Sequence, residues 1–98
     1  MDKQGHVYIM SNKFRTTFYI GITNDLRVRV WQHLNEGGSS FVKKYQCFDL
    51  VYYEHFMSVA DAIDREKQLK NWHRDWKVNL IKTKNPDMID LKTEITSD

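Results

Sequence analysis

Two segments, His6-Val7-Tyr8-Ile9-Met10 and Phe18-Tyr19-Ile20-Gly21-Ile22, decide the fold, because each is rich in residues that favour β-strands and each places one tyrosine among aliphatic residues. Side chains alternate between the two faces of a strand, so each tyrosine points away from the aliphatic side chains beside it. With a turn near residues 12–15, the segments form a hairpin in which Tyr8 lies opposite Tyr19. The pattern therefore predicts two phenols side by side on one surface of a sheet.

The remaining pattern predicts an α+β domain with a small, three-stranded, mostly antiparallel sheet flanked by helices, in the order ββαβαα. We expect strands over 6–11, 17–22 and 49–56, and helices over 25–35, 59–71 and 73–84. Residues 36–48 are typical of a loop, with one helical turn as an alternative. We expect one domain over 1–86, followed by a polar, flexible tail over 87–98.

Composition is that of a globular domain. The chain has 98 residues, of which 41% are hydrophobic and 13% are aromatic. No apolar run approaches the roughly 20 residues of a membrane span. The first residues lack the layout of a signal peptide, and Cys47 is the single cysteine, so no intrachain disulfide is possible. We therefore expect a cytoplasmic protein with no membrane partner.

The charge is unevenly distributed. The net charge is +2, yet residues 65–84 carry seven basic and two acidic residues. A basic helical stretch suits contact with phosphates, although a solvated charged face has the same composition. The candidate phosphate-binding residues, two of which lie in the loop before the third strand, are Lys43, Lys44, Lys67, Lys70, Arg74 and Lys77.

Glu66 is out of place in the helix expected over 59–71. It lies in the middle of an apolar stripe formed by Val59, Ala62, Ile63 and Leu69. A carboxylate that faces a core is costly unless it is paired or binds a cation. A Glu–Arg pair or a position at the rim of the core would explain it structurally. Because we expect this helix to meet the sheet face that carries the tyrosines, a cation site is the alternative.

Arg29 and His33 are four residues apart in the helix expected over 25–35, so they share one face beside a stripe of Leu26, Val30 and Leu34. An arginine can stabilise the charge that develops on a reacting phosphate, and a histidine can transfer a proton near neutral pH. A surface arginine with a stacked histidine is the structural alternative.

These residues together resemble the GIY-YIG nuclease family. His6-Val7-Tyr8 stands where the family has its first triplet, and Tyr19-Ile20-Gly21 matches the second. The resemblance covers about residues 5–86 and is closest to small stand-alone bacterial members; it extends to the catalytic domain of the excision-repair nuclease. By this resemblance, Arg29 takes the position of the catalytic arginine, His33 that of a residue one turn later, and Glu66 that of the metal-binding glutamate. Gly21 and Asn85 are possible supporting residues.

The resemblance implies an endonuclease that hydrolyses phosphodiesters in DNA with one Mg²⁺ or Mn²⁺ ion. Tyr8 would act as general base, directly or through water, and His33 would assist proton transfer. Arg29 and Tyr19 would hold the phosphate, while Glu66 would hold the metal. Such an enzyme would serve in DNA repair or recombination, with weak or structure-directed specificity unless a homodimer or a partner protein supplies more.

Two other functions remain open from the sequence. A non-catalytic nucleic-acid-binding module would use the basic 65–84 region for phosphates, and its binding would fall steeply with salt. A plain interaction domain would respond neither to DNA nor to divalent cations.

Overall fold

The computed structural model describes residues 4–36 and 39–96. Its elements are β1 (Gly5–Ser11), β2 (Phe18–Thr23), α1 (Leu26–Asn35), α2 (Ser40–Tyr45), β3 (Asp49–Phe56), α3 (Val59–Lys70), α4 (Arg74–Lys84) and α5 (Lys92–Thr96). The strands form one antiparallel sheet in the order β2-β1-β3, which confirms the predicted α+β fold. Among these residues, no helix is long and apolar enough to cross a membrane.

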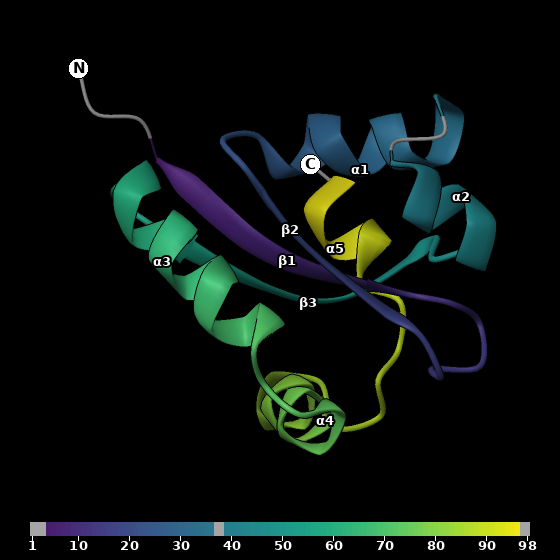
Figure 1. The fold of residues 1–98 in the computed structure, drawn as a ribbon. Helices are drawn as coiled ribbons and strands as arrows, with labels where there is room; N and C mark the ends of the chain where they lie inside the picture. Colours follow the sequence, from purple (N-terminus) through teal and green to yellow (C-terminus); the bar gives the residue numbers. More distant parts are fainter. Residues whose placement is uncertain (1–3, 37–38, 97–98) are drawn as a thin grey trace.

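The sheet has helices on both faces (Figure 1). One face carries a core of aliphatic side chains that includes Val7, Ile9 and Ile20, against which Ala62 and Leu69 of α3 pack. The other face carries Tyr8 and Met10, which pack with residues of α1, α2 and α5. Because successive side chains of β1 point to opposite faces of the sheet, they contribute to two separate cores, and Tyr8 belongs to the core on the α1 side.

The hairpin register differs from the predicted one. Tyr8 lies opposite Gly21, and Tyr19 lies opposite Met10, so the expected pairing of the two tyrosines is wrong. The loop is longer because the Asn12 carboxamide oxygen accepts hydrogen bonds from the backbone N–H groups of residues 16 and 17. The shift amounts to two residues, an even number, so both phenols still lie on one face of the sheet.

Two helical predictions also need correction. The segment expected to be mainly loop contains α2, whose N-cap is Ser39, with its hydroxyl accepting a hydrogen bond from the Val42 N–H. Leu34 of α1 and Ile63 of α3 were expected to be core residues, but they are 42% and 37% exposed. In α1, His33 takes the buried place beside Val30 instead.

The tail predicted to fray from Asp87 is packed against the domain. Leu91 and Ile95 cover the core on the α1 side, and the Leu91 N–H donates to the Leu50 carbonyl at 2.7 Å. Asp90 accepts a hydrogen bond from the Leu50 N–H, so this segment runs along the outer edge of β3. Composition did not reveal this docking, because its two apolar anchors are separated by polar residues.

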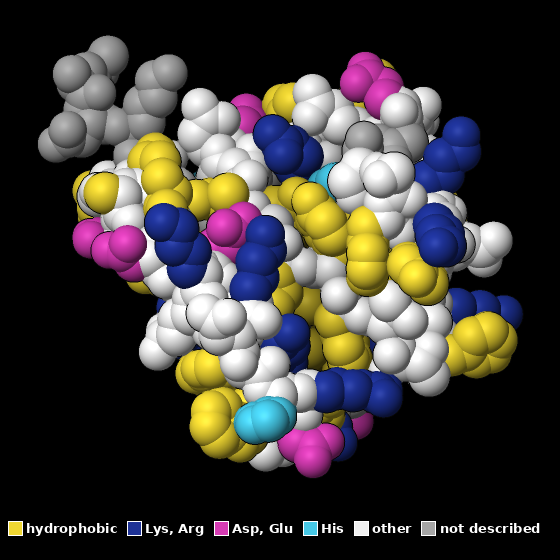
Figure 2. All heavy atoms as spheres, in the orientation of Figure 1, with side chains coloured by type: hydrophobic (Ala, Val, Ile, Leu, Met, Phe, Trp, Pro, Cys, Tyr) yellow, Lys and Arg dark blue, Asp and Glu magenta, His cyan; other side chains and the backbone are white. Residues whose placement is uncertain are grey.

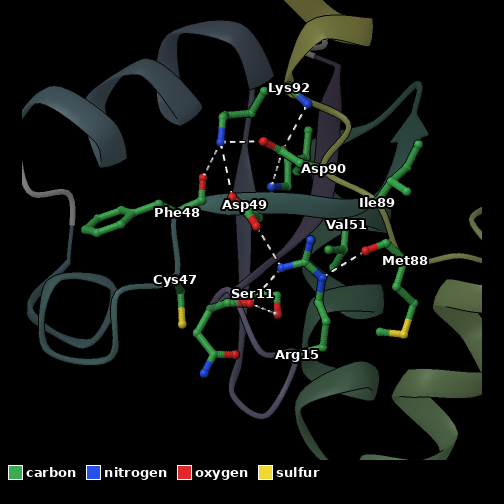
Figure 3. A network of polar contacts seen from close by, with 12 residues as sticks. Ser11, Arg15, Cys47, Phe48, Asp49, Val51, Met88, Ile89, Asp90 and Lys92 are labelled. Carbon is green, nitrogen blue, oxygen red and sulfur yellow. Dashed lines mark hydrogen bonds and ion pairs between the residues drawn. The ribbon is translucent and has the colours of Figure 1, made fainter.

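Asp49 is at the centre of an ionic network that holds this segment (Figure 3). Its carboxylate lies 2.7 Å from Arg15 and 3.4 Å from the Lys92 amine. Arg15 also donates to the Met88 carbonyl, and Lys92 donates to the Phe48 carbonyl. The network thus joins the hairpin loop, β3 and the C-terminal segment.

We expect Asp49→Asn to lower the free energy of unfolding by about 1–2 kcal/mol at neutral pH. Burial alone would raise the pKa of Asp49, but Arg15 and Lys92 outweigh it and hold the pKa below its ordinary value of 3.8. The stabilisation is therefore present above about pH 3.8 and is lost as the pH falls through the lower, folded-state pKa. Urea unfolding of both proteins at several pH values measures this. The exposed Asp87→Asn is the matched control, and an equal loss in it would contradict the assignment.

Candidate active site

Tyr8 is the buried centre of the candidate site. It lies on the middle strand, has no exposed surface, and its hydroxyl is 2.8 Å from Nε2 of His33. His33 is 2% exposed, so this bond joins β1 to α1 inside the protein. Nδ1 of His33 is buried without a hydrogen-bond partner. The pair is therefore a buried proton donor and acceptor with one ring nitrogen unused.

Gly21 explains how the Tyr8 ring reaches this position. A Cβ atom on Gly21 would lie 2.4 Å from both Cζ and the hydroxyl oxygen of Tyr8. The ring therefore lies across β2 in the space that any other residue would fill. This close approach gives the supporting role suggested for Gly21 a steric basis.

Tyr19 lies beside Tyr8 and reaches the surface. Its ring centroid is 6.3 Å from that of Tyr8, 5.5 Å from that of His33 and 5.8 Å from that of Phe41. Because β2 is an outer strand, Tyr19 is only half-buried and solvent can reach it, whereas Tyr8 is completely buried.

Helix α1 places Arg29 and His33 toward the tyrosines. The helix begins after Asp25, whose carboxylate caps the Val28 N–H, so four-residue spacing puts Arg29 and His33 on one face. They line a hollow of about 320 Å³, hereafter the cleft. Its lining residues are Tyr19, Arg29, Gln32, His33, Glu36 and Ser39.

The electrostatics of the cleft keep both partners of the buried pair neutral. Burial raises the pKa of Tyr8 far above its ordinary value, with smaller contributions from Tyr19 and Glu66, while Arg29 acts in the opposite direction. Burial, together with Arg29, lowers the pKa of His33. The imidazole is therefore uncharged near pH 7, and Tyr8 is a phenol rather than a phenolate.

Glu66 approaches the site from an unexpected side. The prediction that its helix meets the tyrosine face is wrong, since α3 packs against the aliphatic face. The Glu66 side chain is 16% exposed and lies 3.5 Å from Lys70, which lines a hollow together with Tyr19 at the β2 edge. Its charge raises the pKa of Tyr8. Glu66 thus acts on the site electrostatically from the β2 side.

Two of the predicted phosphate-binding residues lie beside Tyr19. Lys70 and Lys77 line a second hollow, of about 270 Å³, hereafter the side pocket, which shares Tyr19 with the cleft. Its other lining residues are Phe18, Ile20 and Phe41. Figure 2 shows this face, with hydrophobic side chains in the depression between α3 and α2 and basic side chains around it.

Neither hollow is lined by the remaining predicted phosphate contacts. Arg74 lies over the Phe18 ring, with 5.8 Å between the guanidinium carbon and the ring centroid. Lys43 and Lys44 are exposed on α2, and Lys67 is exposed on α3. The structure thus brings Lys70 and Lys77 to Tyr19 and leaves Lys67 on the surface.

Asn85 belongs to the scaffold. β3 carries a bulge at Val51, which has no partner in β1, and the Asn85 side chain donates to the Val51 carbonyl at 3.0 Å. The same side chain exchanges hydrogen bonds with the backbone of Ile89. Its contacts therefore stabilise the bulge and the turn into the C-terminal segment.

Sequence reasoning missed several residues that line the hollows. Gln32 lines the cleft because it lies on α1 between Arg29 and Glu36. A polar residue in a helix carries no sequence pattern that would have identified it. Phe41 could have been found, because Phe41 and Tyr45 are four residues apart and share one face of a helix. Within residues 4–36 and 39–96, no group of three His, Cys, Asp or Glu side chains could hold a metal ion. The assignment of Glu66 as a metal ligand stays a prediction.

We expect Gly21→Ala to destabilise the protein by about 1–3 kcal/mol, because the added methyl group overlaps the Tyr8 ring. The substitution should also displace the phenol from His33, which changes the chemical shifts of the His33 ring in NMR spectra. Pairing it with Tyr8→Ala in a double-mutant cycle tests the cause, since the penalty should shrink once the ring is gone. An undiminished penalty in that background would place the strain elsewhere.

Known proteins share both this sequence and this fold. The family described as the GIY-YIG catalytic domain matches residues 4–79. A UPF0213 protein from Staphylococcus saprophyticus is 33% identical over 81 residues, which are 83% of this chain and 96% of that protein. A UPF0213 protein from Clostridium perfringens is 34% identical over 80 residues, which are 82% of this chain and 85% of that one. The solution NMR structure of a UPF0213 protein from Bacillus halodurans has a TM-score of 0.57 and 26% identity, and the match covers 96% of this chain and 97% of that one.

Proposed function

Since this chain belongs to the GIY-YIG catalytic domain family, which is a nuclease family, we propose that it is a divalent-metal-dependent endonuclease that hydrolyses phosphodiesters in DNA. The observation that carries the proposal is the buried hydrogen bond between Tyr8 and His33 at the wall of a cleft that Arg29 and Tyr19 also line. We expect weak or structure-directed specificity, unless a homodimer or a partner protein supplies more.

Arg29 and Tyr19 hold the phosphate in the cleft. A guanidinium contacts two phosphate oxygens at once, and the tyrosine hydroxyl donates one further hydrogen bond. Both groups stabilise the additional negative charge that the phosphate gains as water attacks. Helix α1 fixes Arg29 beside His33, so the phosphate is bound next to the proton-transfer pair.

Tyr8 and His33 act together as the base. The raised pKa of Tyr8 means that the phenol does not ionise by itself near pH 7. Neutral His33 can accept the phenol proton at Nε2 while the phenol oxygen takes up the proton that the attacking water releases; because Tyr8 has no exposed surface, this proton passes through a bridging water. The proton therefore moves from water to His33, and no free phenolate forms.

Glu66 fits a Mg²⁺ or Mn²⁺ ion. Its carboxylate is largely buried, its partner within ion-pairing distance is the exposed Lys70, and a hard cation that keeps most of its waters binds through one carboxylate and the phosphate of the substrate. When bound, such an ion supplies stabilisation of charge on phosphate oxygens.

We expect purified protein to cleave supercoiled or branched DNA in Mg²⁺ or Mn²⁺ and not in EDTA. Tyr8→Phe, Arg29→Ala and Glu66→Gln should each lower the cleavage rate by about 10²–10³-fold. Asp64→Asn, an exposed acid on the same helix as Glu66, is the control and should keep full activity. Steeply salt-dependent binding without cleavage products would instead favour a non-catalytic module.

A pH profile tests the proton-transfer pair. The base must be neutral His33, whose pKa is lowered from 6.5, so the cleavage rate should rise with pH along a limb centred below pH 6.5 and then level off. Activity measured from pH 4.5 to 8.5 at fixed metal concentration locates this limb. A limb above pH 7, or one that persists unchanged in His33→Gln, would rule out His33 as the acceptor.

A further inference from the structure

The side pocket and the aromatic residues of α2 continue the cleft toward the surface. Tyr19 lines both hollows, so its ring is the wall between them. Phe41 follows at 5.8 Å from Tyr19, and Tyr45 follows at 4.7 Å from Phe41, measured between ring centroids. These three residues form a row, hereafter the aromatic row, that leads from the candidate active site along α2.

The two members of the aromatic row on α2 are exposed to solvent. Phe41 is 38% exposed and Tyr45 is 43% exposed, although both are large apolar rings. Val42 of the same helix is fully buried. The helix is therefore anchored by Val42, and the rings of Phe41 and Tyr45 are not needed to fill the core.

Positive charge accompanies the row. The Lys44 amine lies 5.3 Å from the centroid of the Tyr45 ring. Lys70 and Lys77 line the side pocket on the other side of Phe41. Aromatic faces combined with flanking cations are the arrangement by which proteins bind unpaired nucleotides, since each base stacks on a ring while each phosphate contacts a cation. An uncharged peptide would have no use for the lysines.

We infer that the aromatic row is a subsite for an unpaired nucleobase next to the scissile phosphate. The base stacks on Phe41 within the side pocket, and the adjacent base of the same strand stacks on Tyr45. Lys70 and Lys77 contact the intervening phosphates. The pocket volume of about 270 Å³, against about 30 Å³ for a water molecule in the liquid, leaves room for a planar base. The inference rests on the proposed nuclease function, because Tyr19 connects this subsite to the scissile phosphate.

Binding without metal separates this subsite from catalysis. The probes are DNA duplexes with an unpaired 3′ or 5′ segment that carries 2-aminopurine, and a fully paired duplex with the same label, in EDTA at fixed salt. Wild type should bind one of the two unpaired probes more tightly than the duplex and quench its fluorescence by stacking. Equal affinity for all three probes, without quenching, would overturn the inference.

Phe41→Leu tests the ring directly, because leucine keeps an apolar side chain but loses the flat face. We expect it to weaken binding of the preferred unpaired probe by about five- to hundredfold, and binding of the duplex by less than twofold. Phe41→Trp should restore affinity and quenching. Trp31→Ala, which removes an exposed aromatic residue of α1 outside both hollows, is the matched control and should behave as wild type.

Failure of the subsite and failure of the nuclease proposal give different results. If Phe41→Leu and Tyr45→Leu keep their melting temperatures and bind and cleave every probe as wild type does, the subsite is wrong while the nuclease stands. If wild type binds and quenches the unpaired probe but never cleaves in Mg²⁺ or Mn²⁺, the nuclease proposal fails and the stacking subsite stands. Equal losses on paired and unpaired probes would show that Phe41 acts on the fold.

Discussion

The hydrogen bond between Tyr8 and His33 is the contact on which the rest of the site depends. It joins the middle strand of the sheet to α1, and both side chains are almost completely buried. Loss of either partner would leave a polar group without a partner in the core, which costs about 1–3 kcal/mol. The bond exists because Gly21 leaves space for the phenol above β2. The absence of a side chain at Gly21 thus allows the sheet and α1 to be joined by this bond.

The two faces of the sheet carry different kinds of side chain. The aliphatic face, covered by α3, carries the hydrophobic core around Val7 and Ile9. The other face supplies the polar pair and the rings that border the cleft. Glu66 connects the two faces, because it lies on α3 and its charge raises the pKa of Tyr8 on the other face.

The sequence predicted the elements better than it predicted their contacts. Alternation and helical spacing placed the three strands and the helices that carry Arg29, His33 and Glu66, because these signals are local. The hairpin register was missed by two residues, since the Asn12 side chain stabilises a longer loop than the turn residues suggest. The side of the sheet that Glu66 approaches was also missed, because helical periodicity does not tell which face of a sheet a helix will cover.

Residues 85–91 have a consequence for how the protein behaves in concentrated solution. Both backbone groups of Leu50 and the carbonyl of Val51 are bonded by this segment, so the open side of β3 presents no free ladder at that point. Unprotected strand edges are templates on which other chains add, and they lead to aggregation. The C-terminal segment therefore covers this part of the β3 edge against the addition of a strand from another molecule.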